Sequence, residues 1–229
     1  MKIGINEVLK QVRLFFIPYL ILLCACLILK AIFTKQEIYF AVNGVYSAAA
    51  DAIAPYVTDA GNGWTIITLS AILLLFNYRA GFLMGSTYAI TSLTAQVVKY
   101  IADAPRPTLL YHDQLSRIHL VKGVYMLQFN SFPSGHTVTA FSTAIVICYL
   151  IKEKRWSFLL LIAAVAVGYS RMYLSEHFFE DVTTGSALGV LLTVCWLAFI
   201  ERKAFIHKAG WQGGLLRRAK KKPGLKSQA

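Results

Sequence analysis

The amino-acid sequence predicts an all-α membrane protein, a six-transmembrane-helix bundle with interfacial helices in the first outer loop. The first observation is composition: 57% of the 229 residues are hydrophobic and 15% are charged, whereas a typical soluble domain has about 25% charged residues. The mean hydropathy of +0.56 points the same way. The second observation is that apolar residues form long blocks, and about 18 consecutive apolar residues suffice for a candidate membrane span.

Six apolar segments follow one another along the chain. The second and fourth are shorter than the ~20 residues that a span needs, so we expect their helices to extend into the flanking loops. The first follows a short basic stretch, as a secretory signal would, but it is long and lacks a small-x-small cleavage site. We therefore interpret it as a retained helix. The segments are Leu14–Phe33, Gly63–Tyr78, Ala80–Ala102, Thr137–Ile151, Trp156–Leu174 and Val182–Ile200.

Lysine and arginine gather on one side of this expected bundle. That side holds three basic residues before the first segment, one between the second and third, three between the fourth and fifth, and nine after Ile200, which makes 16 of 23. By the positive-inside rule this side is cytoplasmic, and both termini lie there. The opposite, outer side then holds loops 34–62 and 103–135 and the short turn 175–181.

Residues 1–202 are expected to form one membrane domain, and residues 203–229 a basic cytoplasmic tail. The net charge of +12 is interpreted as a topology signal, and no nucleic-acid partner is expected. The first outer loop mixes apolar residues with Asn43, Asp51 and Pro55, which favours helices lying in the membrane interface. The second outer loop has no clear period and is expected to be irregular.

The four cysteines all lie inside apolar blocks, without a CxxC pair or a Cys/His ladder. This pattern indicates neither a disulfide framework nor a zinc site, and no cofactor is expected. The chain has no Asn-x-Ser/Thr sequon, which fits a bacterial inner membrane.

Two cations mark the outer end of the third segment. Lys99 lies inside the apolar block, and Arg106 follows between Pro105 and Pro107. A charge within a membrane segment is a functional hypothesis by default. The structural alternative is that Lys99 extends to the interface and Arg106 is a loop cation; the prolines indicate that the helix ends before Arg106.

The second cluster reads Phe132-Pro133-Ser134-Gly135-His136 and directly precedes the fourth segment. Ser134 is a suitable N-cap. The N-terminus of a helix offers unpaired N–H groups that bind anions, and Gly135 lets a ligand approach the backbone closely. The alternative is a plain helix cap with an interfacial histidine.

The third cluster contains Arg171 at the outer end of segment five, then His177 and Asp181 at the entry to segment six. A helical i, i+4 spacing would place His177 and Asp181 on one face. A carboxylate bonded to one ring nitrogen fixes the tautomer and leaves the other nitrogen available for attack. Such a pair can also be purely structural.

The topology brings all three clusters to the outer face of the membrane. The ends of segments three and five lie on the same side as the starts of segments four and six. Three cations, two histidines, one carboxylate and a helix N-terminus converge there. Cations and backbone donors neutralise the equatorial oxygens of a transferring phosphoryl group, so this set predicts phosphate chemistry.

The three clusters resemble the signature motifs of the type 2 phosphatidic acid phosphatase superfamily, the lipid phosphate phosphatases. The resemblance implies a membrane lipid phosphatase without a metal, whose partner is a phosphorylated membrane lipid. It further implies that His177 is a nucleophile forming a phosphohistidine, that Asp181 orients it, and that His136 is the general acid and base. The implied phosphate-binding residues are Lys99, Arg106, Ser134, Gly135 and Arg171.

Several alternatives stay open at this point. A non-catalytic lipid-phosphate binder or transporter could retain the same phosphate-binding residues, and a phosphotransferase could use a lipid acceptor in place of water. The vanadium haloperoxidases share the motifs but are soluble. Ser134 lacks the G-x-S-x-G surroundings of a serine hydrolase, and three nearby cations oppose a zinc site built from the two histidines and the aspartate.

The motifs indicate that a phosphate group is bound, and they do not specify the lipid that carries it. Phosphatidylglycerol phosphate, a polyprenyl diphosphate, phosphatidic acid and lipid A all remain candidates. His119 and Lys122 in the second outer loop are candidates for contact with a second phosphate, against a solvated-loop alternative. Gly185 and Gly189 form a G-x-x-x-G pair that would allow close helix packing, within the chain or between chains, so the oligomeric state is left open.

Overall fold

A computed structural model describes residues 4–216, and within that range every regular element is helical. Residues 217–229, the second half of the expected basic tail, lie outside the described residues. Each of the six apolar segments coincides with one long helix. The elements are α1 (Ile5–Ile32), α2 (Lys35–Asn43), α3 (Ala48–Asp59), α4 (Gly63–Phe76), α5 (Tyr78–Ala102), α6 (Pro107–Leu110), η1 (His112–Arg117), α7 (Gly135–Leu150), α8 (Trp156–Tyr173), α9 (Phe179–Ile200), η2 (Ala204–His207) and η3 (Ala209–Gln212).

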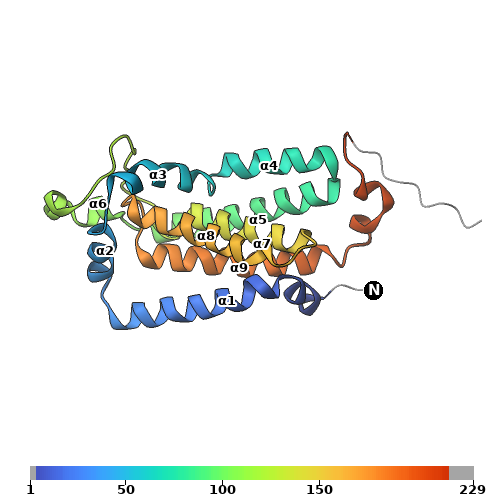
Figure 1. Ribbon diagram of the computed structural model, residues 1–229, viewed down its shortest axis with the longest axis horizontal. Helices are drawn as coiled ribbons and strands as arrows, with labels where there is room; N and C mark the ends of the chain where they lie inside the picture. The colour runs from blue at the N-terminus through green and yellow to red at the C-terminus, as the bar shows by residue number, and fades with distance from the viewer. Residues whose placement is uncertain (1–3, 217–229) are drawn as a thin grey trace, which may run out of the picture.

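The six long helices run side by side along the longest axis of the molecule (Figure 1). The helices α2 and α6 lie at one end of this bundle, with the loops that join α5 to α7. The start of α1 and the short helices η2 and η3 lie at the other end. The bundle therefore has two distinct ends, which we call the loop end and the terminal end.

Three helices, α1, α8 and α9, are each long and apolar enough to cross a membrane. The pair α3 and α4 meets the same criterion only together and is bent by 50°, and α7 is a shorter apolar helix. The expected extension of the second and fourth segments into their loops is wrong for α4, because Asn62 caps its start and Asn77 leaves the helical conformation at its end, and α7 gains only two residues at its start. The helix α5 includes Arg79 and Lys99 together with several threonines and serines, so its composition alone does not mark it as a span. The all-helical, membrane-type fold is confirmed.

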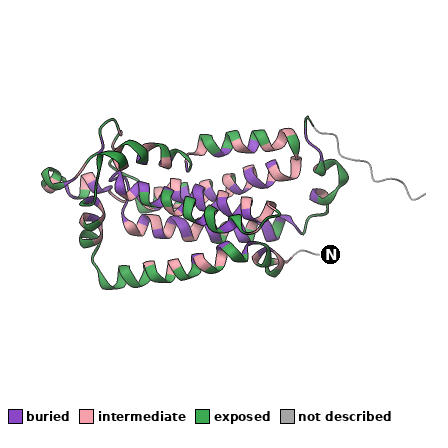
Figure 2. Ribbon diagram, viewed as in Figure 1, coloured by how far each residue is buried: buried purple, intermediate pink, exposed green. Residues whose placement is uncertain are grey.

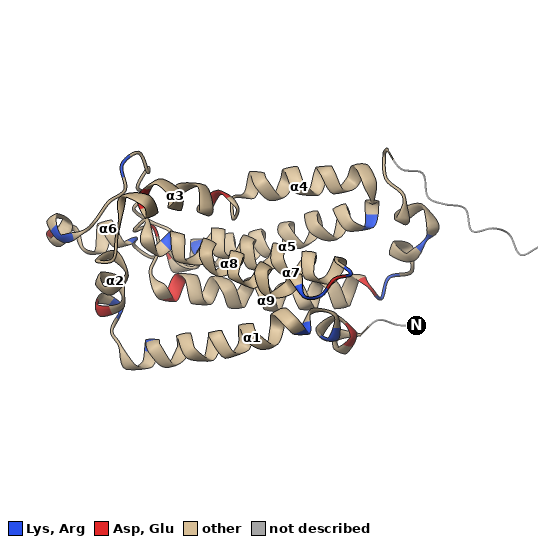
Figure 3. Cartoon of the chain, viewed as in Figure 1, with Lys and Arg blue, Asp and Glu red and all other residues tan. Residues whose placement is uncertain are grey.

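The outward surface of the bundle is strongly apolar. The C-terminal half of α1 exposes large side chains, among them Ile21 and Ile32 at 68% and 66% exposed, and Figure 2 shows α1 as mostly exposed. Charged residues gather toward the two ends of the bundle, and the middle of the helices is tan in Figure 3, the colour of uncharged residues. A wide apolar belt between two charged ends is the surface that a bilayer covers.

The helix α7 forms the centre of the core, with ten buried residues along its length. It packs closely on α9 because α9 presents glycines there. A Cβ at Gly185 would lie 2.8 Å from the carbonyl oxygen of Ser134, and one at Gly189 would lie 2.6 Å from that of Val138. The G-x-x-x-G pair thus serves packing within the chain.

The first outer loop contains helices, as the sequence predicted, and the second is more ordered than the sequence suggested. The first contains the helices α2 and α3, begun by the side chains of Thr34 and Ser47. The second, expected to be irregular, contains α6 and the single 3-10 segment η1. The cause is local: Pro107 is the first residue of α6, a position where its fixed φ favours a helix start.

Candidate active site

The three sequence clusters meet at the loop end of the bundle, where α5 and α8 end and α7 and α9 begin. The helix α5 ends at Asp103, whose φ of 37° places it in the left-handed region. The chain then turns, so Lys99 and Arg106 do not share a helical face. Loop contacts position them instead.

An extended segment, residues 128–131, holds the first cluster in place. The amide of Arg106 donates to the carbonyl of Gln128 at 2.7 Å, and Arg106 Nε donates to that of Phe129 at 3.0 Å. Lys99 Nζ donates to the carbonyl of Asn130 at 2.5 Å. Because this segment leads directly into Ser134, the same contacts place the first cluster beside the second.

Ser134 is the N-cap of α7, as predicted. Its Oγ accepts hydrogen bonds from the amide and the hydroxyl of Thr137, at 3.4 and 2.9 Å. The Ser134 hydroxyl proton therefore stays available for another acceptor. The amide of Ser134 donates to the carbonyl of Asp181 at 3.0 Å, which joins the second cluster to the third.

His177 lies in the turn between α8 and α9, one residue before the N-cap of α9. The amides of Glu176 and His177 both donate to the carbonyl of Arg171, at 3.0 and 3.2 Å. Ser175, at a φ of 55°, turns the chain, and its hydroxyl accepts from Tyr39 and Asn43 at 3.0 Å each. The helix α2 therefore braces the turn that holds His177.

Asp181 and Ser131 hold the ring of His177 on one side. Asp181 Oδ2 lies 3.4 Å from His177 Nδ1, and Ser131 Oγ lies 3.5 Å from the same nitrogen while donating to Asp181 Oδ2 at 2.5 Å. The amide of Phe178 also donates to Asp181 Oδ2, at 2.8 Å. His177 precedes the helix, so this capping geometry, and not a shared helical face, brings His177 and Asp181 together.

The surroundings of His177 favour its neutral form. Burial is the main cause that lowers the pKa of His177 well below its usual range, and the nearby charges of Arg106, Arg171 and Lys99 lower it further. The side chain is 2% exposed. A neutral imidazole with Nδ1 held by a carboxylate presents the lone pair of Nε2, which is what a nucleophilic histidine requires.

Two buried arginines complete the cationic side of the site. Arg171 Nη1 donates to Thr58 Oγ1 of α3 at 2.9 Å, and Arg171 Nη2 lies 3.3 Å from Glu176 Oε2. Arg106 Nη1 pairs with the same carboxylate oxygen and donates to the carbonyl of Glu176 at 3.2 Å. Glu176 thus bridges the two arginines of the candidate site.

Lys99 lines two cavities that open near this cluster. One, of about 200 Å³, also contains Gly135 and His136 in its lining. The other, of about 840 Å³, has Arg106 at its wall together with the apolar side chains of Val97, Leu127 and Phe129. The second cavity offers both a cationic end and an apolar surface.

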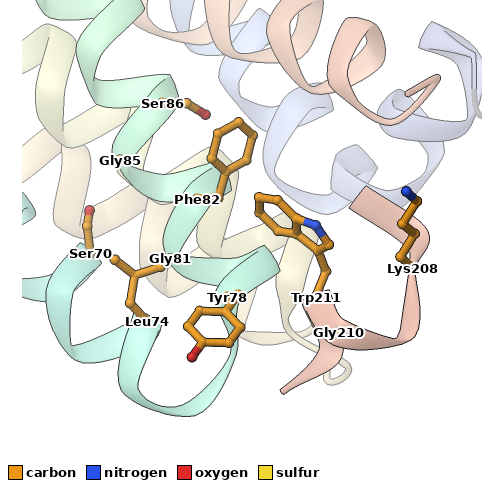
Figure 4. A pocket seen from close by; sticks show the side chains of 10 residues that line it. All are labelled: Ser70, Leu74, Tyr78, Gly81, Phe82, Gly85, Ser86, Lys208, Gly210 and Trp211. Carbon is orange, nitrogen blue, oxygen red and sulfur yellow. The ribbon is translucent and has the colours of Figure 1, made fainter. Parts of the chain in front are cut away.

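A further large cavity lies far from these residues, at the terminal end. Its volume is about 800 Å³, and Phe82, Trp211 and Leu74 dominate its lining, with Lys208 at the rim (Figure 4). Among the described residues, none of those that line it is a histidine or an acid. It is therefore not a second candidate for the chemistry.

The structure brings the predicted residues into one cluster, and it adds residues that sequence reasoning missed. Ser131, Glu176 and Thr58 contact the histidine–aspartate pair or the arginines. Glu176 directly precedes His177 in the sequence, and that position was a usable signal; Ser131 and Thr58 offered none. His119 does not line the two cavities near the site: its ring lies 2.8 Å from Asp51 and stacks on Tyr46.

The structure combines an apolar helical bundle with a buried histidine–aspartate pair that has two arginines and a lysine nearby. This combination is typical of a membrane protein that binds phosphate. A family model described as the PAP2 superfamily matches residues 80–205, more than half of the chain. The chain belongs to this superfamily.

Individual relatives agree with this assignment. The chain is 29% identical over 206 residues to phosphatidylglycerophosphatase B of Bacillus subtilis, covering 80% of this chain and 95% of the relative. It is 26% identical over 172 residues to undecaprenyl-diphosphatase of Sulfolobus acidocaldarius, covering 72% and 75%. The crystal structure of Aquifex aeolicus LpxE matches with a TM-score of 0.63 at 25% identity, covering 71% of this chain and 93% of that one.

Proposed function

We propose that this protein is an integral membrane lipid phosphatase that hydrolyses a phosphate monoester or diphosphate of a lipid through a phosphohistidine. One observation supports this above others: the buried ring of His177 lies 3.4 Å from Asp181 and directly follows Glu176, whose carboxylate pairs with Arg106 and Arg171. Phosphate binding alone requires the cations and does not require an oriented nucleophile.

In the proposed first step, His177 Nε2 attacks phosphorus, and His136 donates a proton to the lipid oxygen as the P–O bond breaks. In the second step, His136 takes a proton from water, which attacks the phosphohistidine and releases inorganic phosphate.

The phosphoryl oxygens are neutralised by three cations, Lys99, Arg106 and Arg171. Ser134 and Gly135 add donors at the start of α7, where backbone N–H groups favour an anion. The three cations supply the positive charge, and no metal is assigned.

We further propose that α1, α4, α5, α7, α8 and α9 each cross the membrane, with α2 and α3 in the outer interface. Both termini then lie in the cytoplasm, and the site faces the periplasm of a bacterial inner membrane. The distribution of basic residues supports this orientation. The apolar wall of the 840 Å³ cavity beside Lys99 and Arg106 supports a substrate with a hydrocarbon chain.

Phosphate release by the detergent-purified protein tests this function. The substrates are phosphatidylglycerol phosphate, a polyprenyl diphosphate, phosphatidic acid and lipid A, each assayed in EDTA. The names of the relatives include an undecaprenyl-diphosphatase and a phosphatidylglycerophosphatase, so both kinds of lipid belong in the panel. We expect release from at least one lipid, and binding without release would instead indicate a lipid-phosphate binder.

His177→Ala provides the decisive variant. We expect it to lower phosphate release by roughly 10³-fold or more, as loss of a nucleophile does in other enzymes, while its size-exclusion profile stays unchanged. His112→Ala, which removes an exposed histidine of η1, is the matched control and should keep full activity. Full activity in His177→Ala would refute the nucleophile assignment.

A further inference from the structure

Glu176 is a buried carboxylate at the centre of the cationic cluster. It is 3% exposed, and its partners Arg106 and Arg171 are 5% and 7% exposed. A single oxygen, Oε2, contacts both guanidinium groups. The next residue in the chain is His177, the residue that would attack phosphorus.

Both arginines have anchors that do not depend on the Glu176 side chain. Arg106 Nε is held by the carbonyl of Phe129 at 3.0 Å, and Arg171 Nη1 by Thr58 at 2.9 Å. The donors that Glu176 engages are Arg106 Nη1 and Arg171 Nη2, and both meet at the same carboxylate oxygen. Arg171 Nε is buried and has no hydrogen-bond partner among residues 4–216. The cluster therefore has donors for an anion with more oxygens than one carboxylate provides.

A carboxylate and a phosphoryl group at this point compete electrostatically. Two like charges a few ångströms apart repel each other strongly at the effective dielectric of a partly buried site. Burial raises the pKa of Glu176, and the two arginines oppose that rise. A bound phosphate would raise the same pKa further. When phosphate occupies the arginines, Glu176 must therefore take up a proton or move its carboxylate away.

We propose that Glu176 is an internal counter-anion that competes with phosphate for Arg106 and Arg171 and so weakens the retention of the phosphate product. This inference rests on the proposed function, because it takes the cluster to be the phosphate site. In the ligand-free protein the carboxylate balances the buried cations. After hydrolysis it returns to the arginines as inorganic phosphate leaves.

Binding of inorganic phosphate to the purified full chain tests the proposal by calorimetry, without any need for turnover. We expect Glu176→Gln to bind phosphate about tenfold more tightly than the wild type at neutral pH, a modest part of the Coulomb repulsion that it removes. Glu176→Ala should also bind more tightly, because the arginines keep their other anchors. If the carboxylate instead served to position the arginines, both variants would bind phosphate more weakly.

The pH dependence of phosphate affinity distinguishes the effect of the charge of Glu176 from the effect of its shape. Below the pKa of Glu176 the wild-type side chain is neutral, as glutamine is, so the affinity ratio of variant to wild type should fall toward one as the pH is lowered. The titration of phosphate itself cancels in this ratio. Glu180→Gln, which removes a carboxylate paired with Lys35 at the same end of the bundle, should leave phosphate affinity unchanged.

A weaker or unchanged affinity in Glu176→Gln, or a ratio independent of pH, would overturn the proposal. Failure of the proposed function gives a different result. In that case no lipid releases phosphate, while the calorimetric comparison still reports whether Glu176 opposes anion binding.

Discussion

At the scale of single residues, the candidate nucleophile depends on a hydrogen-bond network that reaches across the chain. Asp181 Oδ2 accepts from Ser131 Oγ and from the amide of Phe178, and the same oxygen faces His177 Nδ1. Ser131 is fully buried. Its hydroxyl fixes the carboxylate, and the carboxylate in turn fixes the imidazole tautomer.

Ser131→Ala should therefore lower kcat by about tenfold to a hundredfold with little change in KM. A buried hydrogen bond to a charged group contributes about 1.5–3 kcal/mol, and each 1.4 kcal/mol corresponds to about tenfold in rate. Steady-state kinetics on the preferred lipid measure both constants. Ser142→Ala is the control, because this buried serine bonds within α7 to the carbonyl of Thr139. An unchanged kcat would show that Ser131 does not orient the pair.

At the scale of elements, the site depends on how closely α7 and α9 approach. Gly185 faces the carbonyl of Ser134, the N-cap of α7, and Gly189 faces Val138 one turn further. The close approach is what allows the amide of Ser134 to reach the carbonyl of Asp181 at 3.0 Å. The glycines thus set the spacing between the second and third clusters.

Gly189→Ala should destabilise the protein by about 1–3 kcal/mol, the usual cost of inserting a group into a well-packed interior. The new Cβ would meet a backbone carbonyl at 2.6 Å, which cannot move without shifting the helix. The melting temperature in detergent measures the effect. Gly210→Ala serves as control because a Cβ at that position would meet no other described atom within 4 Å. Equal melting temperatures for the two variants would contradict this view of the interface.

At the scale of the whole molecule, hydropathy predicted the long helices because bilayer thickness and helix rise dictate the length of an apolar span. It did not predict the contacts of Glu176, Ser131 and Thr58. Ser131 and Asp181 are 50 positions apart, and Thr58 and Arg171 are 113 apart. Such pairs are set by tertiary packing, which leaves no local period in the sequence. The helices α2 and α3 were expected as elements, but their role in bracing Ser175 and Arg171 was not.

The orientation of the molecule is open to a direct labelling test. In a variant whose native cysteines are replaced, Asp113→Cys places one exposed thiol in η1 at the loop end, and Lys152→Cys places one between α7 and α8. We expect a membrane-impermeant maleimide to label the first in intact cells and the second only after permeabilisation, because the basic side is cytoplasmic. The reverse pattern would invert the proposed topology.

The segment that follows η3 has a consequence for the order of assembly. The amides of Leu215 and Leu216 donate to the carbonyls of Leu74 and Leu75, at 3.2 and 2.8 Å, and the amide of Tyr78 donates to the carbonyl of Gly213 at 2.7 Å. The turn between α4 and α5 therefore receives its last backbone partners from residues that the ribosome makes after every motif of the site. Until those residues are made, these backbone groups cannot form the hydrogen bonds seen in the folded protein, so the turn reaches its final form only after the helices of the site have been synthesised.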